Sequence, residues 1–173
     1  MGLYGAAWDE VGLLRVWPVA DADELARFAE AEDAHVEPLP ERFAILAAFA
    51  RGEPVDVALA PVHLVGPPFF GRVWARLREV GRGRVCTYAQ LARAAGSERA
   101  LRATGQAMAR NPLALVVPCH RVVADHARLG GYAGGAARKR ALLALEGVEV
   151  AGDVVHPGQM DLAVSLDRRA TSS

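Results

Sequence analysis

Cysteine and lysine are both scarce in this chain of 173 residues, which contains two cysteines and a single lysine, Lys139. Cys86 and Cys119 cannot build a disulfide framework, and isolated thiols favour a reducing, cytoplasmic environment. No apolar run reaches the ~18 residues that a membrane-spanning helix needs. The first twelve residues lack the basic segment of a signal peptide. We therefore expect a cytoplasmic protein without a membrane anchor.

Acidic and basic residues cancel overall but gather in different parts of the chain. The net charge is −8 over residues 1–66, +9 over residues 67–150 and −1 over residues 151–173. Gly66, Pro67 and Pro68 lie where the charge changes sign and predict a domain boundary. We predict one domain over 1–66, a second over 67–150 and a C-terminal tail over 151–173. The asymmetry favours an anion-binding second domain, although two solvated faces without a partner would give the same charges.

The first domain has the patterns of a small α+β unit. Apolar segments at 3–8 and 13–19, joined by turn residues, are typical of a β-hairpin. Asp21 is a candidate N-cap for a helix that ends by His35. Apolar residues at helical spacing predict a second helix over 41–51. Weak alternation over 55–62 predicts a third strand.

The second domain is predicted to be mainly helical. Helical patterns cover residues 69–80, 88–95, 99–110 and 136–145, and Thr87 is a candidate N-cap. A buried strand or extended run is expected over 113–117, a glycine-rich loop over 122–135 and a frayed tail after Gly147. The second and third helices, separated by a glycine turn, have the pattern of a helix-turn-helix. An ordinary helical hairpin is the alternative, and the basic surroundings favour DNA binding.

The sharpest chemical feature is the segment Pro118-Cys119-His120-Arg121. A thiol becomes a strong nucleophile as a thiolate, and a neighbouring base or cation promotes that form. His120 could remove the proton of Cys119 directly or through one water, and Glu146 could hold the imidazole in the required tautomer. A buried structural cysteine is the commoner alternative. Two cysteines 33 residues apart, with scattered histidines, match no zinc-binding spacing, so no metal site is expected.

The segment VPCHRVV, residues 117–123, resembles the active-site signature of the O6-alkylguanine-DNA alkyltransferases. The similarity extends over residues 67–147 without a gap in spacing, and it includes the helix-turn-helix segment 87–92 and the loop and last helix at 131–147. It implies an α+β fold. An N-terminal ribonuclease-H-like domain with a three-stranded sheet would precede a helical winged helix-turn-helix domain.

The resemblance implies chemical roles for four residues. Cys119 would accept the alkyl group in one in-line displacement and keep it, so that each molecule acts once. His120 would act as the base through a water, with Glu146 orienting its ring. Tyr88 would help to rotate the target nucleotide out of the duplex and would donate a proton or hydrogen bond to the leaving guanine.

The resemblance also implies the substrate and the residues that bind it. The partner would be double-stranded DNA containing O6-alkylguanine or O4-alkylthymine, bound by a monomer at the nucleoid or elsewhere in the cytoplasm, without a cofactor. Arg102 would fill the space that the flipped nucleotide leaves in the base stack, and Asn111 would tie the recognition helix to the active-site strand. The other residues expected to bind substrate or DNA are Tyr132, Lys139, Arg121, Gly134 and Ala133. The ammonium of Lys139 can pair with a backbone or phenolate oxygen, and a solvated helix residue is the alternative.

Departures from the family pattern concern the pocket and a metal. Some relatives have a tryptophan at the position of Gly134, so we expect a pocket here that admits more than a methyl group. Ala133 offers O6 only its backbone N–H, where some members have a side-chain hydroxyl. No cysteine precedes Cys86, so the structural zinc of some members is not expected. The alternatives are a lesion-recognition protein without transfer, a helix-turn-helix regulator, and a thiol hydrolase that uses Cys119 and His120.

Overall fold

The computed structural model describes residues 3–19, 21–31 and 38–161, and its elements are helices and small sheets of an α+β protein. The chain divides into two compact units. The first contains the residues up to Val65 together with Pro112–Val116, and the second contains Gly66–Asn111 and the residues from Val117 onward. The segment Pro112–Val116, which lies inside the predicted domain 67–150, therefore groups with the first unit.

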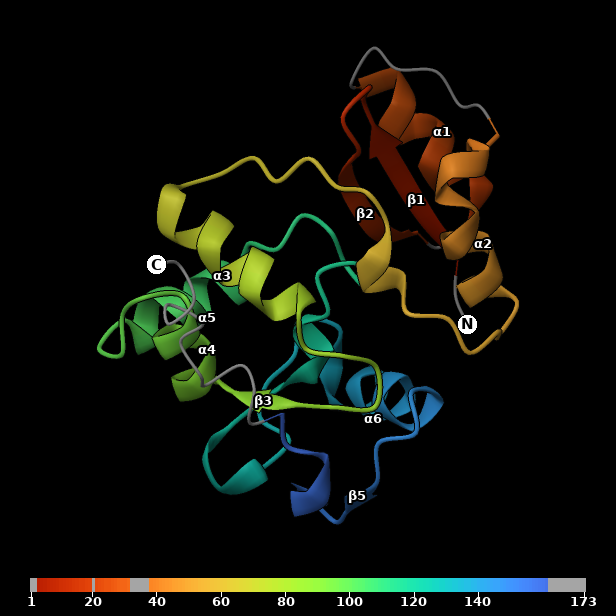
Figure 1. The fold of residues 1–173 in the computed structure, drawn as a ribbon. Coiled ribbons are helices and arrows are strands. Elements are labelled where there is room, and N and C mark those ends of the chain that lie inside the picture. Colours follow the sequence, from red (N-terminus) through yellow and green to blue (C-terminus); the bar gives the residue numbers. More distant parts are fainter. Residues whose placement is uncertain (1–2, 20, 32–37, 162–173) are drawn as a thin grey trace, which may run out of the picture. The chain divides into compact units, whose positions relative to one another are not determined.

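The first unit is built on an antiparallel hairpin of β1 (Leu3–Trp8) and β2 (Leu13–Val19), as predicted (Figure 1). The Asp9 carboxylate closes its turn by accepting hydrogen bonds from the N–H groups of Val11 and Gly12, each at 2.9 Å. Helix α1 (Ala22–Ala31) begins after Asp21, whose carboxylate accepts from the Glu24 N–H at 2.8 Å. The predicted end of this helix near His35 lies outside the described residues. A 3-10 turn, η1 (Glu41–Phe43), leads into α2 (Ala44–Ala50).

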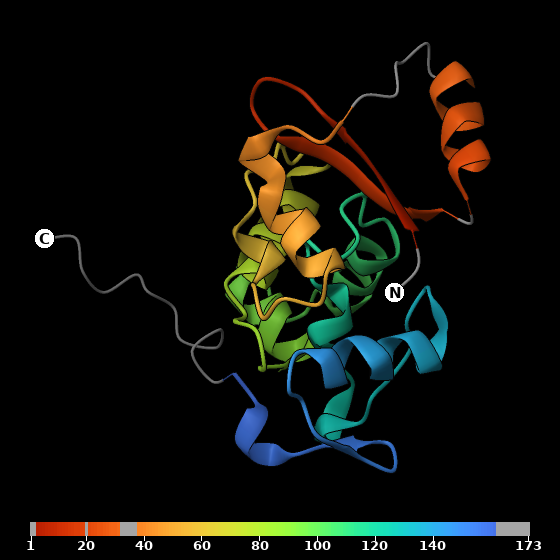
Figure 2. The same cartoon turned by 90° about the vertical axis from the view of Figure 1, so that its right-hand side faces the viewer.

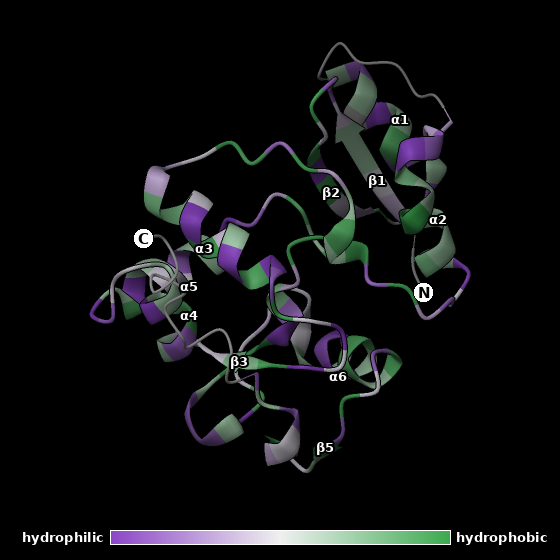
Figure 3. Ribbon diagram, viewed as in Figure 1, coloured by the Kyte–Doolittle hydropathy of each residue, from purple (hydrophilic) through white to green (hydrophobic). Residues whose placement is uncertain are grey.

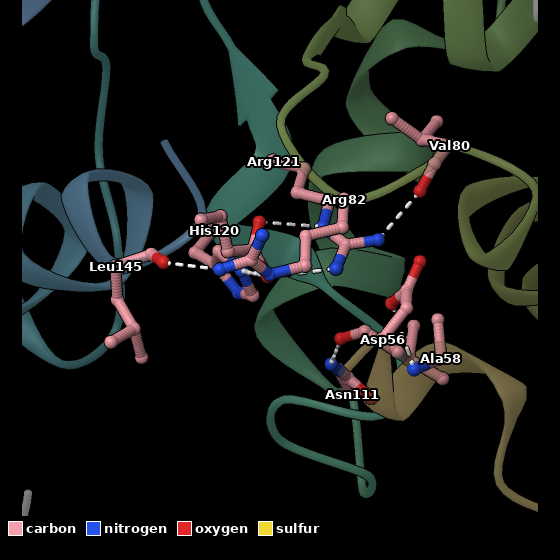
Figure 4. Close-up of polar contacts among 10 residues, drawn as sticks. Asp56, Ala58, Val80, Arg82, Asn111, His120, Arg121 and Leu145 are labelled. Carbon is pink, nitrogen blue, oxygen red and sulfur yellow. Dashed lines mark hydrogen bonds and ion pairs between the residues drawn. The ribbon is translucent and has the colours of Figure 1, made fainter. Parts of the chain in front are cut away.

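The predicted third strand over 55–62 is wrong. Residues Val57–Leu59 form a 3-10 helix, η2, because the Asp56 carboxylate accepts from the Ala58 N–H and stabilises a local turn (Figure 4). Only an isolated bridge joins Val62 to Leu13, and within the described residues the sheet of this unit has two strands. The extended run expected over 113–117 is present only at Leu113, which forms an isolated bridge with Val16, whereas residues 114–116 form a turn in which Leu115 has φ +71°.

Three packed helices make one part of the second unit. Helix α3 (Pro68–Arg78) buries one apolar stripe, and Figure 3 shows the alternation of polar and apolar residues along it. Trp74 donates its indole N–H to the Ala107 carbonyl of α5 (Leu101–Ala109) at 2.9 Å. Helix α4 (Tyr88–Ala94) begins at a capping box, in which Thr87 and Gln90 each bind the other's backbone N–H. The helices predicted over 88–95 and 99–110 are thus present as α4 and α5.

The other part of the second unit surrounds a short parallel pair of strands, β3 (Cys86–Thr87) and β4 (Val122–Val123). Helix α6 (Gly135–Leu145) and the hairpin of β5 (Val150–Ala151) and β6 (Val154–Val155) follow it in the chain (Figure 2). The predicted frayed tail is wrong for residues 148–161, since Val148 and Val155 are buried in the core with Val85 and Leu143. Residues 162–173 lie outside the described residues. No helix in the described part of the chain is long and apolar enough to cross a membrane.

Candidate active site

Cys119 lies in a tight 3-10 turn, η3 (Cys119–Arg121), immediately before β4. The turn is closed by the Arg121 N–H, which donates to the Pro118 carbonyl at 2.8 Å. Cys119 is partly exposed, whereas the side chains of His120 and Arg121 are fully buried. The turn therefore leaves the thiol open to a substrate and directs the two following side chains into the protein.

His120 and Glu146 meet in the interior, as the sequence predicted. His120 Nε2 lies 3.0 Å from Glu146 Oε1, and both side chains are 1% exposed. An ionised carboxylate can only accept hydrogen bonds, so Nε2 carries the proton and donates it. The opposite ring nitrogen, Nδ1, is buried and has no hydrogen-bond partner among the described residues. That nitrogen keeps its lone pair, which makes it the basic atom of the ring.

Arg121 holds the same carboxylate, so its predicted contact with DNA is wrong. Its Nε donates to Glu146 Oε2 at 2.8 Å and its Nη2 to Glu146 Oε1 at 2.7 Å, while Nη1 donates to the Val80 carbonyl at 2.6 Å (Figure 4). Arg121 is 0% exposed and cannot reach a phosphate. Burial acts to raise the pKa of Glu146, but the hydrogen bonds from His120 and Arg121 outweigh it and lower the pKa to about 2.

This low pKa predicts a loss of stability in acid. A carboxyl group whose pKa falls from about 4.5 to about 2 on folding stabilises the protein above pH 4.5, and this stabilisation disappears as the pH falls toward 2. The shift corresponds to about 3 kcal/mol in the free energy of unfolding. Urea unfolding at a series of pH values between 7 and 2 measures it.

The matched control for that measurement is Glu146→Gln. This variant should be less stable at pH 7 by about 3–5 kcal/mol, because Arg121 remains buried without its counterion. The free energy of unfolding of this variant should also decline much less between about pH 5 and pH 2 than that of the parent protein. An equally steep decline in both proteins would assign the acid sensitivity to other carboxyl groups.

Lys139, which the sequence places among the residues expected to bind substrate or DNA, is fully buried in α6. Its ammonium donates to the carbonyls of Val122, Leu129 and Gly131, the first at 2.6 Å. It thereby ties the loop after the nucleophile to the last helix. Burial lowers the pKa of Lys139 to about 8, against the opposing effect of the Cys119 thiolate.

The environment of Cys119 includes Asn111 and Tyr88. Burial raises the pKa of the Cys119 thiol, while a hydrogen bond from the Asn111 side chain and the charge of Lys139 act to lower it. Asn111 Nδ2 also donates to the Val117 carbonyl at 2.8 Å, which links the residue after α5 to the segment before the nucleophile. Burial raises the pKa of the Tyr88 phenol, and a negative charge on Cys119 raises it further. The thiol is therefore mostly protonated at neutral pH and needs a base.

The remaining predicted residues lie on the surface. Arg102 is exposed on α5, Tyr132 is half-buried, and Ala133 and Gly134 are exposed just before α6. A Cβ atom at Gly134 would lie 2.8 Å from Tyr132 Cε1, so the absence of a side chain lets the tyrosine ring pack against the backbone.

Sequence reasoning missed Arg82. Its Nη2 donates to the Leu145 carbonyl, one residue before Glu146, at 2.5 Å (Figure 4). In the sequence this residue stands between two glycines and looks like an ordinary solvated loop arginine. A hydrogen bond to a backbone carbonyl 63 residues away has no signature in the sequence.

A partly exposed cysteine followed by a buried imidazole–carboxylate pair is the arrangement of proteins that use a cysteine as their nucleophile. Residues 68–148 match the family model described as 6-O-methylguanine DNA methyltransferase, DNA binding domain. A methylated-DNA–protein-cysteine methyltransferase of Saccharolobus islandicus is 39% identical over 110 residues, which are 64% of this chain and 70% of the relative. The chain belongs to this family of O6-alkylguanine-DNA alkyltransferases.

Solved structures agree with this assignment. The crystal structure of Mycobacterium tuberculosis OGT in complex with DNA matches with a TM-score of 0.65 and 32% identity, covering 83% of this chain and 85% of that one. The O6-methylguanine-DNA methyltransferase from Pyrococcus kodakaraensis matches with a TM-score of 0.60 and 30% identity, covering 81% and 89%. The resemblance noted from the sequence is confirmed.

Proposed function

We propose that this protein repairs DNA by direct reversal, moving the alkyl group of O6-alkylguanine to the sulfur of Cys119. The sulfur attacks the alkyl carbon, the bond between that carbon and O6 breaks, and its electron pair stays on the guanine. The thioether product has no route back to a thiol, so each molecule acts once. The observation that carries the proposal is the partly exposed Cys119 beside the buried His120–Glu146 pair, inside the segment that matches the family.

The proton path follows from the geometry of the pair. The free lone pair of His120 Nδ1 takes the thiol proton through one water, and the resulting imidazolium is stabilised by Glu146 through Nε2. The raised pKa keeps the Tyr88 phenol protonated at neutral pH, so that it can donate to the leaving guanine. The Cys119 thiolate is therefore generated for the transfer step, although burial disfavours this ionised form in the free protein.

Access to O6 requires the nucleotide to leave the duplex, because a stacked base does not expose that atom to a side chain. We assign α4 and α5 as a helix-turn-helix that enters the minor groove, where little sequence information is available and any sequence can be inspected. Tyr88 rotates the nucleotide, Arg102 fills the gap and Tyr132 lines the guanine pocket. Action as a monomer, the activity on O4-alkylthymine, the ribonuclease-H-like and winged descriptions of the domains, and the cytoplasmic location are further predictions.

Mass spectrometry tests the proposal. Incubation with a duplex that contains one O6-methylguanine should add the mass of one methylene group to the peptide that contains Cys119. One equivalent of DNA should saturate the protein. Tight binding without an adduct would instead indicate a lesion-recognition protein, and continued turnover of small esters would indicate a hydrolase.

Substitution of Arg102 by alanine should separate nucleotide flipping from chemistry. Loss of the side chain that fills the stack leaves the cost of unstacking, a few kcal/mol, without compensation. We expect the rate of transfer from duplex DNA to fall about 10- to 100-fold, while the reaction with free O6-alkylguanine base is nearly unchanged. Quenched-flow transfer assays on both substrates measure this difference.

Arg99→Ala is the matched control, because it removes the same charge from an exposed position just before α5. It should weaken binding to duplex DNA in a salt-dependent way without a selective effect on flipping. Equal losses on both substrates in the Arg102 variant would contradict the assigned role.

A further inference from the structure

Residues 80–84 of the loop between α3 and β3 make three contacts, with Arg121, with Leu145 and with Glu146. The Val80 carbonyl accepts from Arg121, the residue that holds the Glu146 carboxylate, at 2.6 Å. Arg82 Nη2 donates to the Leu145 carbonyl at 2.5 Å (Figure 4). Gly83 has φ +78°, and a Cβ atom there would lie 3.2 Å from the Glu146 carbonyl oxygen. The loop therefore packs directly on the backbone that positions the active-site carboxylate.

Arg82 supplies what the end of α6 requires. Leu145 is the last residue of this helix and Glu146 is its C-cap, so the Leu145 carbonyl has no partner in the next turn. A guanidinium at this end satisfies the carbonyl and interacts favourably with the helix dipole. Arg82 is half-buried, which shields the hydrogen bond from competing water.

The position of Glu146 decides whether His120 keeps its partner. Glu146 Oε1 accepts from both Arg121 Nη2, at 2.7 Å, and His120 Nε2, at 3.0 Å. Arg121 makes a second bond to Oε2 and is always charged, so it stays with the carboxylate when the backbone moves. The longer, single bond to His120 is the one that a displaced Glu146 would lose.

We propose that Arg82 is a positioning residue for alkyl transfer, which anchors the C-terminal end of α6 and thereby keeps Glu146 within hydrogen-bond reach of His120. Arg82 touches neither the reacting atoms nor His120 in this account, and it acts through the backbone of residues 145 and 146. The inference rests on the proposed function for its effect on the rate, but the hydrogen bond that it protects exists in the protein without DNA.

Arg84 provides the matched control. It lies in the same loop, is exposed, and donates through Nη1 to a backbone carbonyl, that of Gly158, at 2.8 Å. Arg84→Met therefore removes the same type of side chain and a comparable bond, to a carbonyl that is not part of α6. A general effect of losing an arginine from this loop would be the same in both variants.

The experiment compares Arg82→Met, Arg82→Lys and Arg84→Met with the parent protein. The first readout is the NMR signal of the His120 Nε2 proton, which a buried hydrogen bond to a carboxylate shifts downfield and protects from exchange, and which His120→Asn identifies. The second is the rate of transfer from a methylated duplex, and the third is thermal unfolding. Arg82→Met should lose the protected signal and slow transfer about tenfold, the size typical of a lost orienting partner.

Arg82→Lys should restore part of the protected NMR signal and part of the transfer rate, since one ammonium can still donate to the Leu145 carbonyl. Arg84→Met should keep the signal and the rate even if its unfolding temperature falls. If Arg82→Met does not fold, the lysine variant decides: its signal must shift and its rate must be intermediate. An unchanged signal in either Arg82 variant, or equal losses in Arg84→Met, would overturn the proposal. Absence of transfer in the parent protein would refute the proposed function alone, because the NMR comparison still reports on Glu146.

Discussion

Replacement of Cys119 by serine is expected to abolish alkyl transfer and to leave DNA binding intact. The hydroxyl is far less acidic than the thiol and is a weaker nucleophile toward carbon, so His120 can no longer generate an effective attacking atom. Binding should persist, because the substitution exchanges one sulfur atom for an oxygen and leaves the residues proposed to contact DNA, such as Arg102, unchanged. The measurement is the mass of the protein after incubation with a methylated duplex, together with a gel-shift or anisotropy titration.

Cys86 supplies the control for this prediction. It is the other free cysteine, it is fully buried in β3, and burial raises the pKa of its thiol to about 12. A thiol held in this form is inert toward alkyl groups. Cys86→Ala should therefore accept one methyl group per molecule like the parent protein. Stoichiometric transfer by Cys119→Ser, or loss of transfer in Cys86→Ala with folding retained, would contradict the assignment of Cys119 as the alkyl acceptor.

Local signals in the sequence were sufficient for the hairpin and most helices. Asp21 and Thr87 mark helix starts by chemistry that acts within three residues, and both caps are present in the structure. The errors arose where a competing contact decided the outcome. The hydrogen bond of Asp56 stabilises a 3-10 helix in a segment whose weak alternation suggested a strand. Val148 and Val155 are buried in the core, although the composition of this segment suggested a tail.

The active site shows the same division between local pattern and distant contact. The meeting of His120 and Glu146 was predicted, because the motif and the last helix have a fixed spacing in the family that the chain resembles. The contact of Arg121 with DNA was predicted wrongly, since a positive charge in a basic segment suggests DNA while this side chain is in fact buried. Lys139 is also buried, and its ammonium binds backbone carbonyls, which is a pairing expected of an ammonium. Arg82 had no signal at all, because its partner is a backbone carbonyl.

The width of the substrate pocket is the property that Gly134 is expected to control. We expect free O6-benzylguanine to inactivate the parent protein measurably, because Gly134 adds no side chain beside Tyr132, which is proposed to line the guanine pocket. Burial of the benzyl ring is worth about 1–3 kcal/mol when space is available. Gly134→Trp should abolish this inactivation and spare the repair of methylated DNA, since a methyl group needs far less room.

A side chain at position 134 could reduce the sensitivity to benzylguanine in two ways, by its own volume or by displacing the ring of Tyr132. A Cβ atom at position 134 would already lie 2.8 Å from Tyr132 Cε1 and from Arg138 Cδ, so any side chain here displaces the tyrosine ring. Gly134→Ala tests that displacement alone, and we expect it to retain most of the sensitivity to benzylguanine, because the ring and the long arginine side chain can both rotate away. The indole adds bulk that no such rotation can accommodate, so only the tryptophan variant should become insensitive. If the parent protein already resists millimolar inhibitor, or if the alanine and tryptophan variants lose sensitivity equally, the side-chain volume at position 134 does not gate the pocket and the placement of Tyr132 does.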